Sequence, residues 1–318
     1  MKKLLSILLV VLLTAGMLAG CGGASSGKSG KTKIGIAAPD VTHGWVAGVA
    51  YYAEKYCEDH DIVYKTTTSS DAAEMMANLN DLVTWGADAI VIWPQWEGME
   101  TAVSEVVSQN VQVVSFDVDI ACEGIHKVTG NNYDMGYQCA KYITDKVGAA
   151  ANIAVMDVPS GSSVSRLRKQ GFYDYLNEIG YDQSNIFEVA EAGFTRDAGL
   201  KDMTDILESH AQVDAVFSMD DENSIGIIQA IREAGRTDIK AITGGGGMQE
   251  YFGMINSADY ADLGLATALY SPAMVEDAIE KAIELCNGKE CDAEIVIPTK
   301  IVNSENVKDY IDPDNKVY

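Results

Sequence analysis

The sequence predicts an α/β protein in which two doubly wound, Rossmann-like parallel sheets form two lobes. Short apolar strands alternate with amphipathic helices over residues 33–256, as in chains of βαβ units. A loop before residue 132 interrupts the alternation, which then restarts as a second series of similar length. Because ligands of such sheets bind beyond the carboxyl ends of the strands, we expect a site in the cleft between the lobes.

The first series begins at residue 33. The helix that opens at Asp71 has Glu74 three residues on, which is a capping-box arrangement, and it ends at Gly86. Residues 89–93 form the continuous apolar run that a strand buried on both faces requires. In order, we expect strand 33–37, helix 45–60, strand 63–66, helix 71–86, strand 89–93, helix 99–109 and strand 111–116.

The second series follows the same rhythm. In order, we expect helix 132–147, strand 153–157, helix 163–179, strand 186–189, helix 197–210, strand 214–219, helix 221–234, strand 239–243 and helix 249–256. The folded part should begin near Thr32. It should end close to Tyr310, because the last eight residues are mostly polar and include Pro313.

Residues 1–20 predict a secretory signal peptide. Two lysines precede an apolar run over 4–13 that is too short to span a membrane, and small residues follow it. The end of this segment, LAGC at 18–21, resembles the lipobox of bacterial lipoproteins, which implies that Cys21 is lipidated and becomes the mature N-terminus. Residues 21–31 are mostly Gly, Ser and Lys and predict a flexible linker. We therefore expect an exported protein that contacts the membrane only through this lipid.

The composition limits the classes of partner that the protein can bind. The chain is 47% hydrophobic and 22% charged, which is typical of a globular protein, and its formal net charge of −24 would repel nucleic acid. The five cysteines beyond Cys21 show no CxxC spacing, so no zinc site is indicated. Cys286 and Cys291 flank a turn-forming segment, which leaves open a disulfide between them or five buried or idle thiols.

The sequence contains no recognisable catalytic motif. Gly244–Gly247 follows a strand, but Gln249 occupies the last glycine position of a GxGxxG pattern, and GK[ST], HExxH and GxSxG are absent. Four glycines more simply form a wall close to a ligand. The run 220–222 (DDE) lacks the alternating ligands of a calcium loop and suits a helix N-terminus. We expect no metal, cofactor or catalysis.

Seven segments resemble, in order, the ribose-type periplasmic sugar-binding proteins, which are type I substrate-binding proteins of ABC importers. The segments are 33–39 (KIGIAAP), 42–45 (THGW), 85–91 (WGADAIV), 116–117 (FD), 130–136 (GNNYDMG), 166–172 (RLRKQGF) and 215–221 (AVFSMDD). The resemblance covers nearly all of 32–300. It implies a periplasmic binding protein type I fold with a three-stranded hinge, crossing near Gly130, Leu269 and Val296. The N-terminal lobe would then comprise 32–130 plus 269–295, and the C-terminal lobe 131–268 plus 296–318.

The resemblance also implies a ligand site. A monosaccharide needs polar side chains at its rim and aromatic rings on its faces. The aromatic positions of the family fall on Trp45, after the polar position His43, and on Phe194 from the other lobe. The hydroxyl-binding acid falls on Asp117 and the second-lobe arginine on Arg168. Core packing for Trp45, a loop anchor for Phe194 and a solvated helix face for Arg168 are the alternatives.

Several positions depart from the family pattern. Val118 replaces an arginine and Asp119 follows it, Asp220 replaces an asparagine, and Gly245 lies in the glycine run that replaces an aspartate. Leu269 replaces a closing glutamine, with Tyr270 next to it. The loss of two hydroxyl acceptors argues against ribose and leaves another sugar, a polyol or a less polar small ligand open.

These observations predict a monomeric, extracytoplasmic lipoprotein that closes its lobes over a small sugar or polyol and delivers it to the permease of an ABC importer. Two alternatives remain at this point. One is a sensor module that presents the liganded state to a membrane receptor or kinase. The other is a secreted sugar-modifying enzyme.

Overall fold

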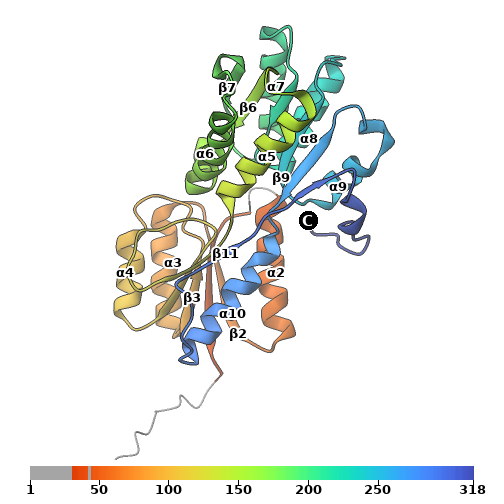
Figure 1. The fold of residues 1–318 in the computed structure, drawn as a ribbon. Helices are drawn as coiled ribbons and strands as arrows, with labels where there is room; N and C mark the ends of the chain where they lie inside the picture. Colours follow the sequence, from red (N-terminus) through yellow and green to blue (C-terminus); the bar gives the residue numbers. More distant parts are fainter. Residues whose placement is uncertain (1–30, 42–43) are drawn as a thin grey trace, which may run out of the picture. The chain divides into compact units, whose positions relative to one another are not determined.

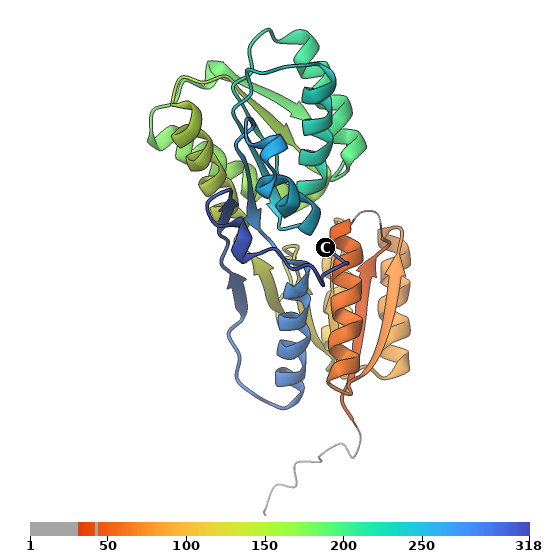
Figure 2. The same ribbon diagram turned by 90° about the vertical axis from the view of Figure 1, so that its right-hand side faces the viewer.

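The structure, a computed structural model, describes residues 31–41 and 44–318. Thr32–Tyr318 forms one compact unit that contains two six-stranded sheets, in the orders β11-β5-β4-β3-β1-β2 and β12-β10-β9-β8-β6-β7 (Figures 1 and 2). All neighbouring strands run parallel except β10 and β12. The predicted fold class, two doubly wound parallel sheets, is confirmed.

Helices cover both faces of the first sheet. Apolar residues of α2 and α10 share one core cluster with the sheet, and those of α3 and α4 share another. As the capping box predicts, the Asp71 side chain accepts a hydrogen bond from Glu74 N at 2.9 Å, but Glu74 accepts from Ser70 N rather than from Asp71. The elements are β1 (Lys33–Pro39), α2 (Gly44–Asp59), β2 (Val63–Ser69), α3 (Ala72–Trp85), β3 (Ala89–Ile92), α4 (Glu100–Ser108), β4 (Gln112–Phe116), β5 (His126–Gly130), α10 (Val275–Cys286) and β11 (Glu294–Ile297).

The second sheet is covered in the same way, by α5 and α6 on one face and by α7, α8 and α9 on the other. The backbones of α5 and α6 approach closely, because a Cβ atom on Gly136 would lie 1.7 Å from the carbonyl oxygen of Arg168. The elements are α5 (Asn132–Val147), β6 (Ile153–Asp157), α6 (Ser162–Glu178), β7 (Ile186–Ala190), α7 (Arg196–Ser209), β8 (Ala215–Phe217), α8 (Asp221–Glu233), β9 (Ala241–Gly246), α9 (Gln249–Asn256), β10 (Leu265–Leu269) and β12 (Ile301–Asn303).

The chain passes between the two sheets three times. The passages follow Gly130 at the end of β5, Leu269 at the end of β10, and Ile297 at the end of β11. Val296, where the third crossing was expected, still pairs with Thr129 inside the first sheet.

The expectation that the folded part ends near Tyr310 is wrong. Only 5% of the Tyr318 side chain is exposed. Asn315 Nδ2 donates to the hydroxyl of Tyr52 on α2 at 3.2 Å, and Asp312 N donates to Gln249 Oε1 on α9 at 2.8 Å. The polar residues of this segment therefore bind the surfaces of both lobes and carry a buried aromatic ring between them.

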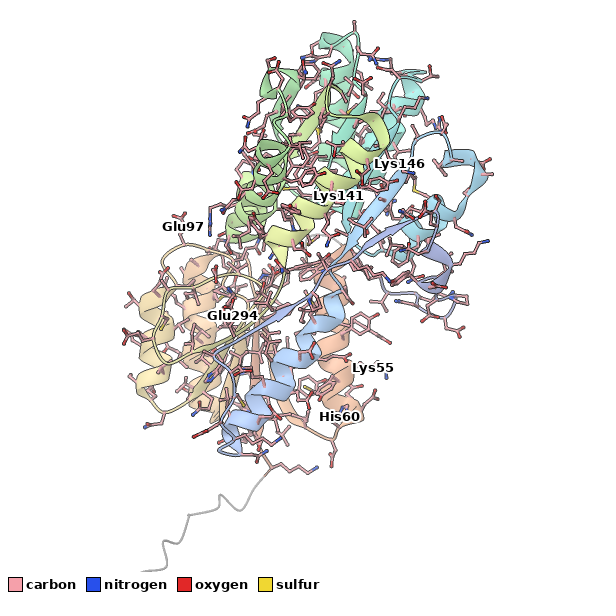
Figure 3. The ribbon with its side chains drawn as sticks, viewed as in Figure 1. Lys55, His60, Glu97, Lys141, Lys146 and Glu294 are labelled. Atoms are coloured by element: carbon pink, nitrogen blue, oxygen red, sulfur yellow. The ribbon has the colours of Figure 1, made fainter. Side chains whose placement is uncertain are left out.

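Charged side chains lie mainly on the surface. Lys55 and Lys141 each pair with an acid four residues further on, at 2.6 and 2.7 Å, and Glu294 pairs with Lys127 at 2.8 Å (Figure 3). The five cysteines of the described part of the chain are thiols, so the suggested disulfide between Cys286 and Cys291 is not formed. In this same part, no helix combines the length and apolar character needed to cross a membrane.

Candidate ligand-binding site

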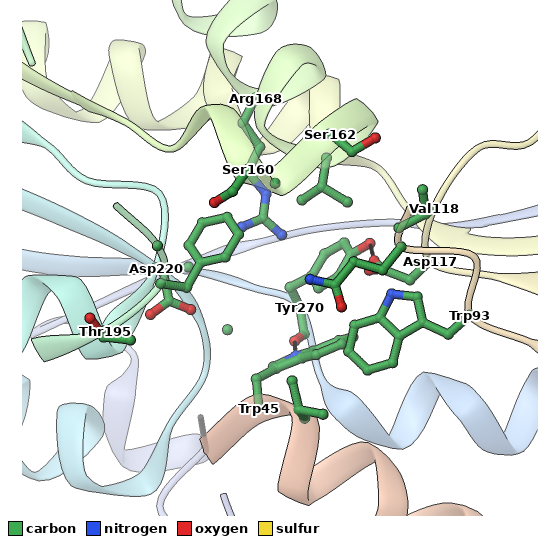
Figure 4. Close-up of a pocket in the computed structure, with 18 of the residues that line it drawn as sticks. Trp45, Trp93, Asp117, Val118, Ser160, Ser162, Arg168, Thr195, Asp220 and Tyr270 are labelled. Carbon is green, nitrogen blue, oxygen red and sulfur yellow. Dashed lines mark hydrogen bonds between the residues drawn. The ribbon is translucent and has the colours of Figure 1, made fainter. Parts of the chain in front are cut away.

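A cavity of about 300 Å³ lies at the carboxyl ends of strands from both sheets (Figure 4). The first sheet contributes residues just after β3 and β4 and at the start of α2. The second sheet contributes residues after β6, β7 and β8 and at the end of β9. The sequence-predicted residues that line it are Trp45, Asp117, Arg168, Phe194, Asp220, Gly245 and Tyr270. This is the position that the topology predicts for a shared ligand site.

Aromatic side chains form much of the wall. The ring of Trp45 stacks on Phe116 with centroids 6.1 Å apart and meets Trp93 edge-on at 5.2 Å. Trp45 is thus both packed into the core of the first lobe and exposed to the cavity. Phe194 approaches from the second lobe, against Gly161, where an added Cβ atom would lie 2.9 Å from the phenyl ring. Rings on both lobes suit the apolar faces of a small ring-shaped ligand.

Asp117 is held at the end of β4 in a left-handed backbone conformation, with φ of 67°. Its N–H donates to Val128 O at 2.9 Å, and its Oδ1 accepts a short hydrogen bond from the Tyr270 hydroxyl. Burial raises the pKa of this carboxyl, while Tyr270 and Arg168 oppose the rise. The nearby Trp93 side chain also lowers the pKa of Asp117. Its buried Nε1 forms no hydrogen bond of ordinary geometry with any described residue.

Arg168 is the buried cation of the site, with 5% of its surface exposed. Its Nε donates to Asn132 Oδ1 at 2.9 Å and its Nη1 to Met219 O at 2.7 Å. The guanidinium lies 4.6 Å from the centre of the Tyr270 ring. These two bonds use Nε and one N–H of Nη1, which leaves both N–H groups of Nη2 and the second N–H of Nη1 for a ligand.

Asp220 follows β8 and caps α8. Its Oδ1 accepts from Glu222 N at 2.7 Å and from Asn223 N at 3.3 Å. Burial and the neighbouring Asp221 raise the pKa of Asp220 to about 8, against the opposing effect of Arg168. Asp220 can therefore accept or donate a hydrogen bond near neutral pH, depending on its protonation.

Gly245 and Gly246 of the glycine run line the cavity and pack closely against other parts of the protein. A Cβ atom on Gly245 would lie 2.4 Å from Met219 O, and one on Gly246 would lie 2.1 Å from the Tyr318 hydroxyl. Gly246 and Gly247 have φ values of 138° and 98°, which favour glycine. Asp221 fixes this turn by accepting from Gly247 N at 2.7 Å and Met248 N at 2.8 Å.

One sequence-predicted residue, Asp119, stands apart from the cavity. Asp119 pairs with Lys127 on a partly exposed surface and does not line the cavity, whereas its neighbour Val118 does. His43 and the predicted lipidation site Cys21 lie outside the described residues. Asn132, which binds both Arg168 and Tyr270, was not predicted from the sequence, although it lies within the 130–136 segment that carries the resemblance.

No group of three or more His, Cys, Asp or Glu side chains in the described ranges is arranged to hold a metal ion. The polar groups that face the cavity are instead hydrogen-bond donors and acceptors at its rim, including Ser160, Ser162, Thr195 and Gln95. Such an arrangement suits reversible binding of a neutral, polar small molecule.

Two doubly wound sheets with a cavity between them define a two-lobed small-molecule-binding protein. The chain belongs to the periplasmic binding protein domain family, whose profile matches residues 34–290. The family resemblance predicted from the sequence is therefore confirmed.

Three individual proteins resemble this chain at low sequence identity. The chain is similar to the ribose import binding protein of Bacillus subtilis, with 27% identity over 95% of this chain and 99% of that protein. It is also similar to a xylitol-binding protein of Mycolicibacterium smegmatis, with 24% identity over 84% of each chain. A periplasmic solute-binding protein of an ABC transporter from Actinobacillus succinogenes, solved with bound D-allose, shares the fold with a TM-score of 0.79. That structure has 20% sequence identity and covers 88% of this chain and 100% of its own.

Proposed function

We propose that the protein is an extracytoplasmic solute-binding protein that captures a small sugar or polyol between its lobes and delivers it to an ABC importer. The observation that carries this proposal is the cavity, in which Trp45 and Trp93 from one lobe face Phe194, Arg168 and Asp220 from the other. The names of the relatives, which bind ribose or xylitol, support the same class of ligand.

Size and chemistry favour a single sugar ring or a short polyol. Small-molecule sites usually measure roughly 300–1,000 Å³, and this cavity of about 300 Å³ lies at the lower limit. Trp45 and Phe194 would contact the C–H faces of the ligand. Arg168 Nη2 would bind a hydroxyl at its rim through a charge-assisted hydrogen bond. The second carboxyl oxygen of Asp220 would accept from or donate to another hydroxyl, depending on its protonation.

We also propose how the two lobes are divided along the chain and how the protein is anchored to the membrane. The N-terminal lobe would comprise 32–130 plus 270–297 and the C-terminal lobe 131–269 plus 298–318, hinged at the passages between the sheets. Residues 1–20 would be removed on export, and a lipid on Cys21 would hold the mature monomer at the cell membrane through the linker 21–31.

A thermal-shift screen tests the ligand class. The panel contains pentoses, hexoses, 6-deoxyhexoses and polyols, each with the purified protein from residue 32 onward. A ligand at 100 times its dissociation constant should stabilise the native state by about 2.7 kcal/mol. Absence of stabilisation by every sugar and polyol would refute the proposal.

A second measurement separates binding from catalysis. The stabilising ligand is incubated with the protein for a long period and then recovered and identified by mass spectrometry and NMR. A binding protein returns it unchanged, whereas a converted ligand would favour a sugar-modifying enzyme.

A further inference from the structure

Tyr270 connects the two polar residues that the family resemblance assigns to ligand hydroxyls. Its hydroxyl donates to Asp117 Oδ1 and accepts from Asn132 Nδ2 at 3.1 Å. Asn132 Oδ1 in turn accepts from Arg168 Nε at 2.9 Å. A continuous chain of hydrogen bonds thus runs from the acid of the first lobe to the arginine of the second, and it is completed by protein groups alone.

The Tyr270 ring is fixed on several sides. Arg168 covers one face at 4.6 Å from the ring centre, and Trp45 Nε1 donates to the Tyr270 carbonyl at 2.7 Å. The backbone N–H of Tyr270 donates to Gly246 O at 2.9 Å. Gly130 makes room for the ring, since a Cβ atom there would lie 2.2 Å from Tyr270 Cε2. Only 4% of the Tyr270 surface is exposed, so these neighbours enclose the side chain almost completely.

This arrangement changes what the cavity offers a ligand on that side. One oxygen of Asp117 and the Nε and Nη1 groups of Arg168 are already hydrogen-bonded. Tyr270 lines the cavity beside these two residues. A ligand hydroxyl pressed against the carbon atoms of its ring would lose its hydrogen bonds to water without replacement, whereas a C–H or methyl group would lose none.

We propose that Tyr270 is a specificity-determining residue that takes the place of a ligand hydroxyl, so that the cleft selects a deoxy sugar or deoxy polyol. The ligand presents C–H or methyl groups to Tyr270 and retains adjacent hydroxyls for Arg168 Nη2 and Asp220 on the other side. This inference rests on the proposed function. The inference adds to that function the class of ligand, which is a deoxy sugar or deoxy polyol.

The test uses matched pairs that differ by a single hydroxyl. The pairs are L-fucose and L-galactose, L-rhamnose and L-mannose, 6-deoxy-D-glucose and D-glucose, and 2-deoxy-D-ribose and D-ribose, with dissociation constants measured by isothermal titration calorimetry. In at least one pair, the wild-type protein should bind the deoxy member about 10–100-fold more tightly, which is the discrimination that an apolar surface achieves against an added hydroxyl.

Two variants assign this preference to Tyr270. Tyr270→Gln replaces the ring with a polar side chain and should reduce the ratio below threefold by improving binding of the hydroxylated member. Tyr270→Phe keeps the ring and should keep the preference. Tyr173→Phe is the matched control, because it removes a tyrosine hydroxyl that also donates to a carboxylate, Glu188 Oε2 at 2.6 Å, but lies away from the cavity.

The outcomes separate the inference from the proposed function. If the wild-type protein binds the hydroxylated member as tightly as the deoxy member in every pair, the inference is overturned and the proposed function stands. The same holds if a folded Tyr270→Gln protein keeps the wild-type ratio. If no sugar or polyol binds at all, both are overturned. If Tyr270→Gln fails to fold, the ratios of the wild-type protein and of Tyr270→Phe still test whether the cleft prefers the deoxy member of a pair.

Discussion

Glu191 is a buried acid whose charge opposes folding, and its replacement by glutamine should make the protein less sensitive to alkaline pH. Only 3% of Glu191 is exposed, and its Oε2 accepts from Asn223 Nδ2 at 3.0 Å. Oε1 has no hydrogen-bond partner in the described chain. Burial, opposed by Asn223 and reinforced by Asp202, Asp220 and Asp157, raises the pKa of Glu191 to about 8.

The sign and size of the effect follow from proton linkage. A raised acid pKa means that the native state binds more protons than the unfolded state between the two pKa values, so stability falls as pH rises through this window. For a shift from 4.5 to about 8, the loss from this one group amounts to about 1 kcal/mol at pH 5 and about 4 kcal/mol at pH 8. The glutamine side chain does not titrate, so Glu191→Gln should gain about 3 kcal/mol relative to wild type over this range.

Urea denaturation of the wild-type protein and Glu191→Gln at pH 5, 6, 7 and 8 measures this difference. The change of the difference with pH is the relevant quantity, because the fixed cost of burying an amide is the same at every pH. The control is Glu208→Gln on the exposed surface of α7, which makes the same substitution outside the core. A difference between wild type and Glu191→Gln that stays constant from pH 5 to pH 8 would refute the reasoning.

Four other outcomes are expected. Cys21→Ser should leave the protein unprocessed or shed into the medium, because the linker has no other affinity for the membrane; unacylated wild-type protein found wholly in the medium by mass spectrometry would contradict this. Tyr318→Ala should lower the free energy of unfolding by about 3–5 kcal/mol, as for other buried aromatic rings, and an unchanged urea midpoint would contradict its burial. Arg168→Ala should weaken binding of the identified ligand at least tenfold by calorimetry, while Arg166→Ala on the exposed face of the same helix should not; equal losses would place the ligand elsewhere. Small-angle scattering should show a smaller radius of gyration with saturating ligand, and identical curves would exclude closure of the lobes.

The sequence predicted the two sheets because their central strands and helices carry strong periodic patterns. It missed β5 and β10, since β5 has a single fully buried aliphatic residue, Val128, and β10 (LATAL) consists largely of small residues that give no clear period. Helix α10 could have been predicted. Its buried residues Val275, Ala278, Ile279 and Ala282 follow the spacing of an amphipathic helix.

Other features depend on contacts between distant segments. The last eight residues are mostly polar and give no local sign that Tyr318 is buried. Its burial depends on Gly246, where a Cβ atom would lie 2.1 Å from the Tyr318 hydroxyl. Asp119 was grouped with Asp117 because the two are close in sequence. The turn at Asp117 directs Val118 to the cavity and leaves Asp119 beside Lys127. The bond between Tyr270 and Asp117 joins residues 153 positions apart, so no local pattern reveals it.

The location of Tyr270 joins ligand selection to the proposed hinge. Tyr270 directly follows the passage at Leu269, and Asn132 lies two residues after the passage at Gly130. In a rotation about these passages, displacement grows with distance from the axis, so groups near them move least. Phe194, on the loop after β7 at the far edge of the second sheet, is farther from them along the sheet and would move more. The side of the cavity that excludes a hydroxyl would then be preformed in the open protein, and the aromatic face of the second lobe would complete the site only on closure. A ligand with an extra hydroxyl at that position would be rejected before the lobes close.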